Sequence, residues 1–245
     1  MSKKIIVYEA FVPTSDGRDF MYYKLEPLLT NLKRKWEESE LPKNNVDIIF
    51  KCPAFQRSLA NTFVYKSPYD LEVYYDEQGR YRLRLPTAEL NDDHTEPAID
   101  TTTGREDNHA IQLFTGKSNK FLFATTSCEL TIEQPYFHNK EHTILSGTFN
   151  IGKWFRPIHP ALINLEKKNV SIKRGDALLY LKFPKDVKIE IRRTYLGPRG
   201  FNLSMGCGGY KIYDRLAPLE KLYKYFEEMA PRKNLIRELE ENRIN

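Results

Sequence analysis

The sequence predicts a mainly β fold, a sandwich or a barrel. Short runs in which apolar and polar residues alternate recur along most of the chain. Turn-forming residues separate these runs at the spacing typical of all-β domains. The stretch 144–183 reads as strand, aromatic corner, strand, Gly-Asp turn and strand, without a helical period. The chain has 245 residues, 40% of them hydrophobic and 13% aromatic, which suffices for one large core.

The N-terminal part of the chain contains predicted strands and one helix. Residues 5–12 form the opening strand, and apolar residues at helical spacing between Tyr23 and Trp36 predict an N-terminal helix. Further strands are predicted at 46–51, 61–65, 70–75 and 81–85. Because the last two alternate cleanly on either side of Asp76-Glu77-Gln78-Gly79, we expect them to form a hairpin.

A polar segment, 86–109, divides the predicted strands into two groups. It lacks apolar residues almost completely, and a loop of this length is typical of a binding lid or a mobile insertion. Strands are predicted after it at 110–114, 121–124, 129–133, 144–151, 161–165, 170–173, 177–183 and 188–195. Gly175-Asp176 supplies the turn before the strand 177–183.

The end of the chain changes to a helical period. An apolar stripe from Leu219 to Met229 is broken by Pro231, and Leu235, Ile236 and Leu239 continue in a shorter helix. We therefore divide the chain into a β domain, 1–215, and a C-terminal helical tail, 216–245. Such a tail usually packs on its own domain. A homo-oligomer formed through these helices stays open as the alternative.

Charge is concentrated in one segment. The net charge of the chain is +5. The segment 182–215 holds eight basic and three acidic residues, so it alone carries the whole excess. Arg192, Tyr195 and Arg199 are its candidate ligand-binding residues, because cations with interleaved aromatic rings suit a polyanion such as nucleic acid. The alternative is a solvated strand face, since apolar and charged residues alternate regularly from 187 to 192.

Neither a membrane span nor a secretory signal is predicted. No apolar run approaches the roughly 18 residues that a span needs, and the first apolar run ends at Glu9. Cys52, Cys128 and Cys207 are far apart and odd in number, which favours reduced thiols over disulfides or a zinc ribbon. We expect a protein of the cytoplasm that is not secreted.

Three phrases carry a resemblance: CPAFQRSLANTFVYKSPYDLEV (52–73), FNIGKWFRPIHPALI (149–163) and VSIKRGDALLYLKF (170–183). They resemble uncharacterised proteins encoded mainly by tailed bacteriophages. The last two also resemble late strands of cupin-like jelly rolls. The resemblance covers about half of the chain. It implies a jelly-roll, or double-stranded β-helix, sandwich and a viral setting in the host cytoplasm, and it assigns no catalytic residue.

A jelly roll of this type suggests one enzymatic hypothesis, an Fe(II)/2-oxo-acid-dependent oxygenase. His94 and Glu96 give the His-x-Glu pair, and His159 would be the third ligand. Arg174 or Arg192 would bind the carboxylate of a 2-oxo acid such as 2-oxoglutarate. The third ligand of such sites usually follows the Gly-Asp turn, but no histidine follows His159 here. We therefore expect no metal site and keep the oxygenase as the alternative.

The aromatic corner is the remaining candidate site. Trp154 and Arg156 either fill and cap the barrel or line a concave ligand site. His138 and His142 would share a face only on a helix, and their segment reads as a loop. The sequence thus favours a non-enzymatic phage-type binding or assembly module without cofactor, whose partner is a polyanion or a protein.

Overall fold

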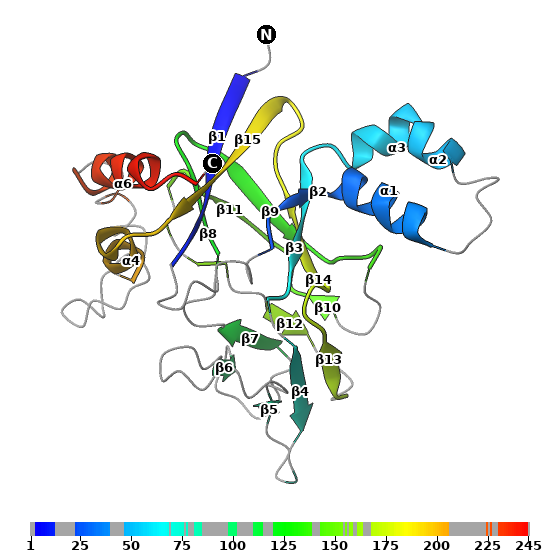
Figure 1. Cartoon of the computed structure of the whole chain (residues 1–245). Coiled ribbons are helices and arrows are strands. Elements are labelled where there is room, and N and C mark those ends of the chain that lie inside the picture. The colour runs from blue at the N-terminus through cyan, green and yellow to red at the C-terminus, as the bar shows by residue number, and fades with distance from the viewer. Residues whose placement is uncertain are drawn as a thin grey trace.

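The computed structural model describes most of the chain and is drawn in Figure 1. The described residues are 3–12, 23–39, 47–68, 70–75, 77, 81–84, 98–101, 110–114, 120–138, 143–153, 155, 157–158, 161–163, 168–205, 224, 226 and 230–244. In this part of the chain strands predominate and form several sheets, as the sequence predicts. No helix within it is long and apolar enough to cross a membrane.

The strands are short apart from the first and the last. They are β1 (Lys3–Phe11), β2 (Glu26–Pro27), β3 (Thr62–Lys66), β4 (Leu71–Tyr75), β5 (Tyr81–Arg84), β6 (Ala98–Thr101), β7 (Ala110–Phe114), β8 (Phe121–Ala124), β9 (Glu129–Glu133), β10 (Thr143–Ile144), β11 (Gly147–Asn150), β12 (Ala161–Ile163), β13 (Val170–Ile172), β14 (Ala177–Lys182) and β15 (Val187–Tyr195). The helices are α1 (Leu28–Glu38), α2 (Asp47–Lys51), α3 (Pro53–Ser58), α4 (Pro198–Met205) and α6 (Ala230–Glu241).

Two sheets contribute most of the main core. One has the order β15-β1-β8 and the other β11-β9-β14-β3-β2. Two smaller sheets, β13-β4-β5 and β10-β12-β7-β6, lie below them in Figure 1. Buried side chains from both large sheets, such as Val7, Leu122 and Leu181, belong to one continuous apolar cluster. The helices α1, α2 and α3 lie to the right of the sheets in this view, and α4 and α6 lie to the left (Figure 1).

The opening strand is the centre of its sheet. β1 pairs in parallel with β15, from Lys3 opposite Val187 to Phe11 opposite Tyr195, and antiparallel with β8. Successive side chains of a strand point to opposite faces. Val7 accordingly enters the main core, whereas Tyr8 enters a second core that includes Leu235 and Leu239 of α6. Both faces of β1 are therefore covered, which explains its long apolar run.

The C-terminal helix is fastened to this sheet by polar contacts as well as by its apolar face. The Thr194 hydroxyl donates to the Leu239 carbonyl at 2.7 Å, and the Ile244 amide donates to the Arg193 carbonyl at 3.0 Å. Leu235 and Leu239 are buried in one apolar cluster with residues of the chain's own β1 and β8. The homo-oligomer through these helices stays a prediction, and Leu235 and Leu239 are not exposed for it.

Two local predictions are confirmed. β4 and β5 pair antiparallel, with Val73 opposite Leu83, as the predicted hairpin requires. Gly175 adopts a positive φ of 89°, a conformation open to glycine, in the turn before β14. The Asp176 carboxylate accepts the Lys173 amide across this turn at 2.8 Å.

Three predicted segments differ in the structure. Residues 46–51 were predicted as a strand because Val46, Ile48 and Ile49 favour one, but Asp47–Lys51 is the helix α2, and Phe50 packs edge-on against Phe55 of α3. Segment 86–109 was predicted as a loop and contains β6, which gains its backbone hydrogen bonds from β7. The predicted strand 144–151 is divided into β10 and β11, which join different sheets.

Candidate functional site

Several predicted site residues lie outside the part of the chain that the structure describes. These are Trp154 and Arg156 of the aromatic corner and His94, Glu96 and His159 of the iron hypothesis. Their roles stay predictions. The same holds for the boundary at 215 between the β domain and the tail. Among the described residues, no group of three or more His, Cys, Asp and Glu side chains is arranged to hold a metal ion.

The described basic residues of segment 182–215 do not form one flat patch. Arg192 contacts Glu190 at 2.7 Å and Glu240 of α6 at 2.5 Å. Arg193 points to the opposite face of β15, where its Nε lies 3.7 Å from Glu9. The predicted strand requires this, because two consecutive residues of a strand point to opposite faces. Lys182 pairs with Glu133 at 2.7 Å. Carboxylates of this chain therefore already neutralise several of these cations.

The other two candidate residues of this segment differ in exposure. Tyr195 is half-buried and packs edge-on against Phe11, with 5.0 Å between the ring centroids. Arg199 is exposed on α4. A binding role for Arg192, Tyr195 and Arg199 stays a prediction.

A substitution pair separates the structural role of Arg192 from a surface role. Arg192→Gln removes the cation that joins β15 to α6, and we expect it to lower the Tm by roughly 2 to 4 °C. Arg199→Gln removes an exposed cation, and we expect the Tm to stay within about 1 °C. Thermal unfolding followed by circular dichroism checks both. Equal shifts would contradict the role given to the Arg192 to Glu240 contact.

A charged cluster is buried between the two large sheets, and sequence reasoning missed it. Glu9 is fully buried and Lys120 almost so. The Lys120 ammonium donates to the Glu9 carboxylate and to the Tyr23 carbonyl, and it lies 5.8 Å from the Tyr65 ring centroid. Arg193 adds a second cation beside Glu9. The signal in the sequence was one carboxylate within the apolar run IIVYEAF.

This cluster is a structural ion pair with unusual electrostatics. Burial lowers the pKa of Lys120, while the Glu9 carboxylate acts in the opposite direction. A lysine with a lowered pKa can serve as a nucleophile. Here the Lys120 side chain is only 4% exposed, and its ammonium makes both contacts described above. The ion pair therefore fixes β1 against Lys120, the residue that precedes β8. We assign no chemical role to the pair.

The surface feature with the clearest binding character is a group of aromatic rings, which we call the aromatic patch: Phe50, Phe55, Tyr136 and Phe137. Their ring centroids are 6.0 Å apart for Phe50 and Phe55, 6.1 Å for Phe55 and Phe137, and 4.7 Å for Tyr136 and Phe137. Tyr136 is 49% exposed and Phe137 is 46% exposed. The patch thus joins α2, α3 and the turn after β9 into one partly exposed aromatic surface.

Polar contacts hold the turn that carries the exposed rings. The Phe137 amide donates to the Tyr180 hydroxyl at 3.2 Å, and the Tyr136 ring packs edge-on against the Tyr180 ring at 5.2 Å. His138 contacts the same hydroxyl and also Asn31 of α1. The rings are therefore held on a rigid base formed by β14 and α1, although they lie on a connecting segment.

Several of the described cations lie near the aromatic patch or on the helices that supply its rings. Lys35 of α1 interacts electrostatically with His138, and Lys182 with Tyr136. Lys51 and Arg57 are exposed on α2 and α3, the helices that supply Phe50 and Phe55. Of the carboxylates near the turn, Glu133 pairs with Lys182, Glu26 pairs with Lys66, and Asp176 lies within electrostatic range of His138.

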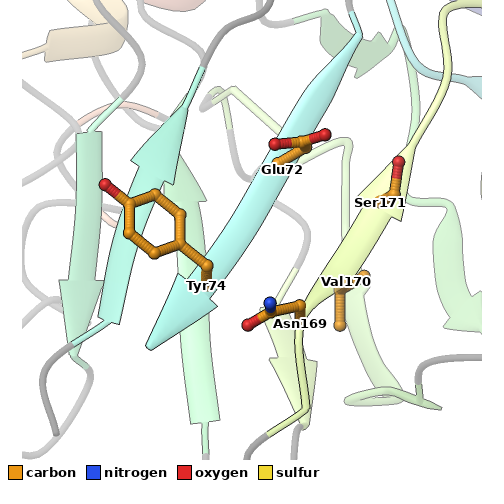
Figure 2. A pocket seen from close by; sticks show the side chains of 5 residues that line it. All are labelled: Glu72, Tyr74, Asn169, Val170 and Ser171. Atoms are coloured by element: carbon orange, nitrogen blue, oxygen red, sulfur yellow. The ribbon is translucent and has the colours of Figure 1, made fainter. Parts of the chain in front are cut away.

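A shallow hollow lies between β4 and β13. It has a volume of about 240 Å³ and is lined by Glu72, Tyr74, Asn169, Val170 and Ser171. Figure 2 shows Glu72 and Tyr74 extending from one strand and Asn169 and Ser171 from its neighbour. Glu72 and Ser171 are direct partners in the strand register. Such groups can bind a polar ligand by hydrogen bonds, but the hollow is open and contains none of the predicted site residues.

Comparisons with known proteins add no assignment. The chain matches no known family model, and no characterised protein sequence matches it significantly.

Proposed function

We propose that this chain is a non-enzymatic binding module that engages single-stranded nucleic acid through the aromatic patch. The observation that carries the proposal is the pair of exposed rings, Tyr136 and Phe137, next to exposed cations. Proteins that bind single strands combine aromatic rings, on which bases stack, with cations that follow the phosphates. Stacking on a ring requires no particular base, so such binding tolerates many sequences.

The distribution of charge supports a nucleic acid over a neutral partner. The neighbourhood of the aromatic patch contains Lys35, Lys51, Arg57, Lys66 and Lys182. Among the described residues, the acidic residues in the same neighbourhood include Glu26, Glu38, Asp47, Glu133 and Asp176. Two of these cations, Lys66 and Lys182, pair with Glu26 and Glu133, and the chain as a whole carries +5. A positive surface attracts a polyanion and speeds its association.

The predicted jelly-roll fold, the viral setting and the basic segment are also part of this proposal. We propose a jelly-roll-like sandwich and a role in a tailed-phage assembly in the host cytoplasm, both supported by the resemblance of the three sequence phrases. The parallel pair of β1 and β15 departs from the antiparallel pairing expected of a jelly roll. Arg199 and Lys188 are exposed and would bind further phosphates of the nucleic acid. The oxygenase alternative depends on His94, Glu96 and His159, and no observation on the described residues favours it.

The test is the affinity of the purified chain for a fluorescein-labelled oligothymidine, measured by anisotropy. Because one stacked base contributes roughly 1 to 3 kcal/mol, Phe137→Ala or Tyr136→Ala should weaken binding roughly 5- to 150-fold. Replacing Lys35, Lys51 or Arg57 with glutamine should lower the log–log salt slope by about 0.7 for each phosphate that the variant no longer neutralises.

Tyr74→Ala is the matched control, because Tyr74 is a half-exposed tyrosine in the hollow of Figure 2, away from the aromatic patch. We expect it to leave the affinity unchanged. If Phe137→Ala and Tyr74→Ala have equal effects, the rings of the aromatic patch are not the binding surface. If the wild-type chain binds no oligonucleotide and instead binds a protein partner, nucleic acid is the wrong class of ligand.

A further inference from the structure

The hydrogen bonds around His138 form a network that runs from the aromatic patch to α1 and β2. The Phe137 amide donates to the Tyr180 hydroxyl at 3.2 Å, and that hydroxyl lies 2.6 Å from His138 Nδ1. His138 Nε2 lies 2.7 Å from Asn31 Oδ1, and Asn31 Nδ2 donates to Glu26 at 2.5 Å. The network therefore links the backbone beside an exposed ring to a buried amide and a carboxylate.

The chemistry of the partners determines the direction of each hydrogen bond. Asn31 uses its amide nitrogen on Glu26, so its oxygen faces His138 and can only accept. Nε2 of His138 must therefore carry a proton. In a neutral imidazole Nδ1 is then an acceptor, and the Tyr180 hydroxyl donates to it. Burial raises the pKa of Tyr180, which keeps this donor protonated. Every group in the network is satisfied only when His138 is neutral.

The neighbours of His138 act in both directions: the lysines favour its neutral form and the carboxylates favour its charged form. These neighbours are Asn31 and Lys35 of α1, Glu26 of β2, Lys66 of β3, Asp176 of the turn before β14, and Tyr180 of β14. Burial lowers the pKa of His138 to about 4, and Lys35 and Lys66 act in the same direction. Although burial raises the pKa of Glu26, hydrogen bonds from Asn31, Arg34 and Lys66 hold it at about 2. Glu26 thus stays ionised while His138 titrates.

Protonation of His138 breaks the network at Tyr180. Nδ1 then becomes a donor and turns toward the Tyr180 oxygen, which already accepts the Phe137 amide. The hydroxyl proton then loses Nδ1 as its acceptor, and water does not replace Nδ1 because Tyr180 is fully buried. We propose that His138 is an acid-operated latch: in its neutral form it holds Tyr136 and Phe137 in the aromatic patch, and its protonation releases them. The effect of this latch on ligand binding rests on the proposed function, whereas the test of the latch itself does not.

The free energy of unfolding should decrease when His138 is protonated. The unfolded chain protonates this histidine near pH 6.5, whereas the folded chain resists protonation until about pH 4. Between these values the unfolded state binds more protons, so the contribution of His138 to the free energy of folding is lost as the pH falls from about 6.5 to 4. The folded protein is therefore expected to become less stable on acidification as the latch opens.

The experiment is a pH titration of the full chain by NMR, from about pH 7.5 to about pH 3.5, a window that spans the folded and unfolded pKa values of this histidine. At the upper limit the two-bond ¹H–¹⁵N spectrum should show His138 as the Nε2–H tautomer. The ring shifts of His138 and the amide protection factor of Phe137, corrected for intrinsic exchange, should then change with one midpoint near 4. Tyr180→Phe removes the donor to Nδ1, so the midpoint of the His138 titration should move upward. Titration of His138 without loss of Phe137 protection would overturn the latch.

Oligothymidine binding at each pH separates this inference from the proposed function, since thymine does not protonate in this range. If affinity falls roughly tenfold or more with the same midpoint, both stand. If Phe137 is released but no oligothymidine binds at any pH, the latch stands and the proposed ligand is wrong. If binding is present and unchanged through the His138 titration, the regulatory inference is wrong. His138→Gln should remove the acid-dependent step in either measurement.

Discussion

Replacing Glu9 with glutamine is expected to lower the free energy of unfolding by about 3 to 5 kcal/mol, the cost of breaking a buried ion pair. Glu9 is fully buried, and its carboxylate accepts from Lys120 and faces Arg193. In Glu9→Gln the Lys120 ammonium stays in the protein interior without its counter-charge. Urea unfolding followed by tryptophan fluorescence measures the loss.

Two further variants distinguish a buried pair from a general effect of the substitution. Glu38→Gln makes the same chemical change in an exposed pair with Arg34, and we expect a loss of less than about 1 kcal/mol. The double variant Glu9→Gln/Lys120→Met removes the orphaned charge and should recover part of the stability that Glu9→Gln forfeits. If Glu9→Gln unfolds at the same urea concentration as Glu38→Gln, Glu9 and Lys120 do not form a buried pair.

The second large effect is expected for Phe123→Ala, at about 3 to 5 kcal/mol. Phe123 is fully buried on β8, and its ring lies 5.8 Å from the rings of Phe155 and Phe226 in edge-to-face packing. The Arg232 guanidinium lies 5.7 Å from the same ring. Truncation therefore leaves a cavity where the helical C-terminal part meets the sheet β15-β1-β8, and it also removes the aromatic contacts.

Limited proteolysis adds a readout that overall stability does not give. Loss of the Phe123 ring should make the segment around α6 the first to be cleaved, because this ring joins it to the sheet. Phe137→Ala is the matched control, since it removes an exposed phenylalanine and should change the free energy of unfolding by less than about 1 kcal/mol. Equal losses in the two variants would contradict the packing of the C-terminal part on β8.

The sequence predicted elements whose signal is local. β14 and the β4-β5 hairpin were predicted because alternation and turn residues are visible within a few positions. α2 was missed because a short helix rich in β-branched residues resembles a strand, and only its packing on α3 decides between them. The parallel pairing of β1 with β15 joins the two ends of the domain, and no local pattern encodes it.

The candidate site was harder to predict than the fold. Tyr136 and Phe137 are adjacent in a segment that reads as an ordinary loop, and their partners Phe50 and Phe55 come from a distant part of the chain. Arg192 was predicted to contact a ligand because the sequence shows its charge. It does not show that Glu240 folds back against it. The number of cations in a sequence segment therefore overestimates the positive charge that can bind a partner, because carboxylates from other parts of the chain neutralise some of them.

The most direct measurement of nucleic-acid binding by the aromatic patch is photo-crosslinking of the full chain to an oligothymidine that carries 5-iodouridine, followed by peptide mass spectrometry. A base stacked on an aromatic ring is close enough to crosslink to it. We expect crosslinks at Tyr136, Phe137 or Phe55, and we expect excess unlabelled oligothymidine to remove them. Crosslinks confined to 182–205, with none on the aromatic patch, would contradict this account and place the nucleic acid on the basic segment instead.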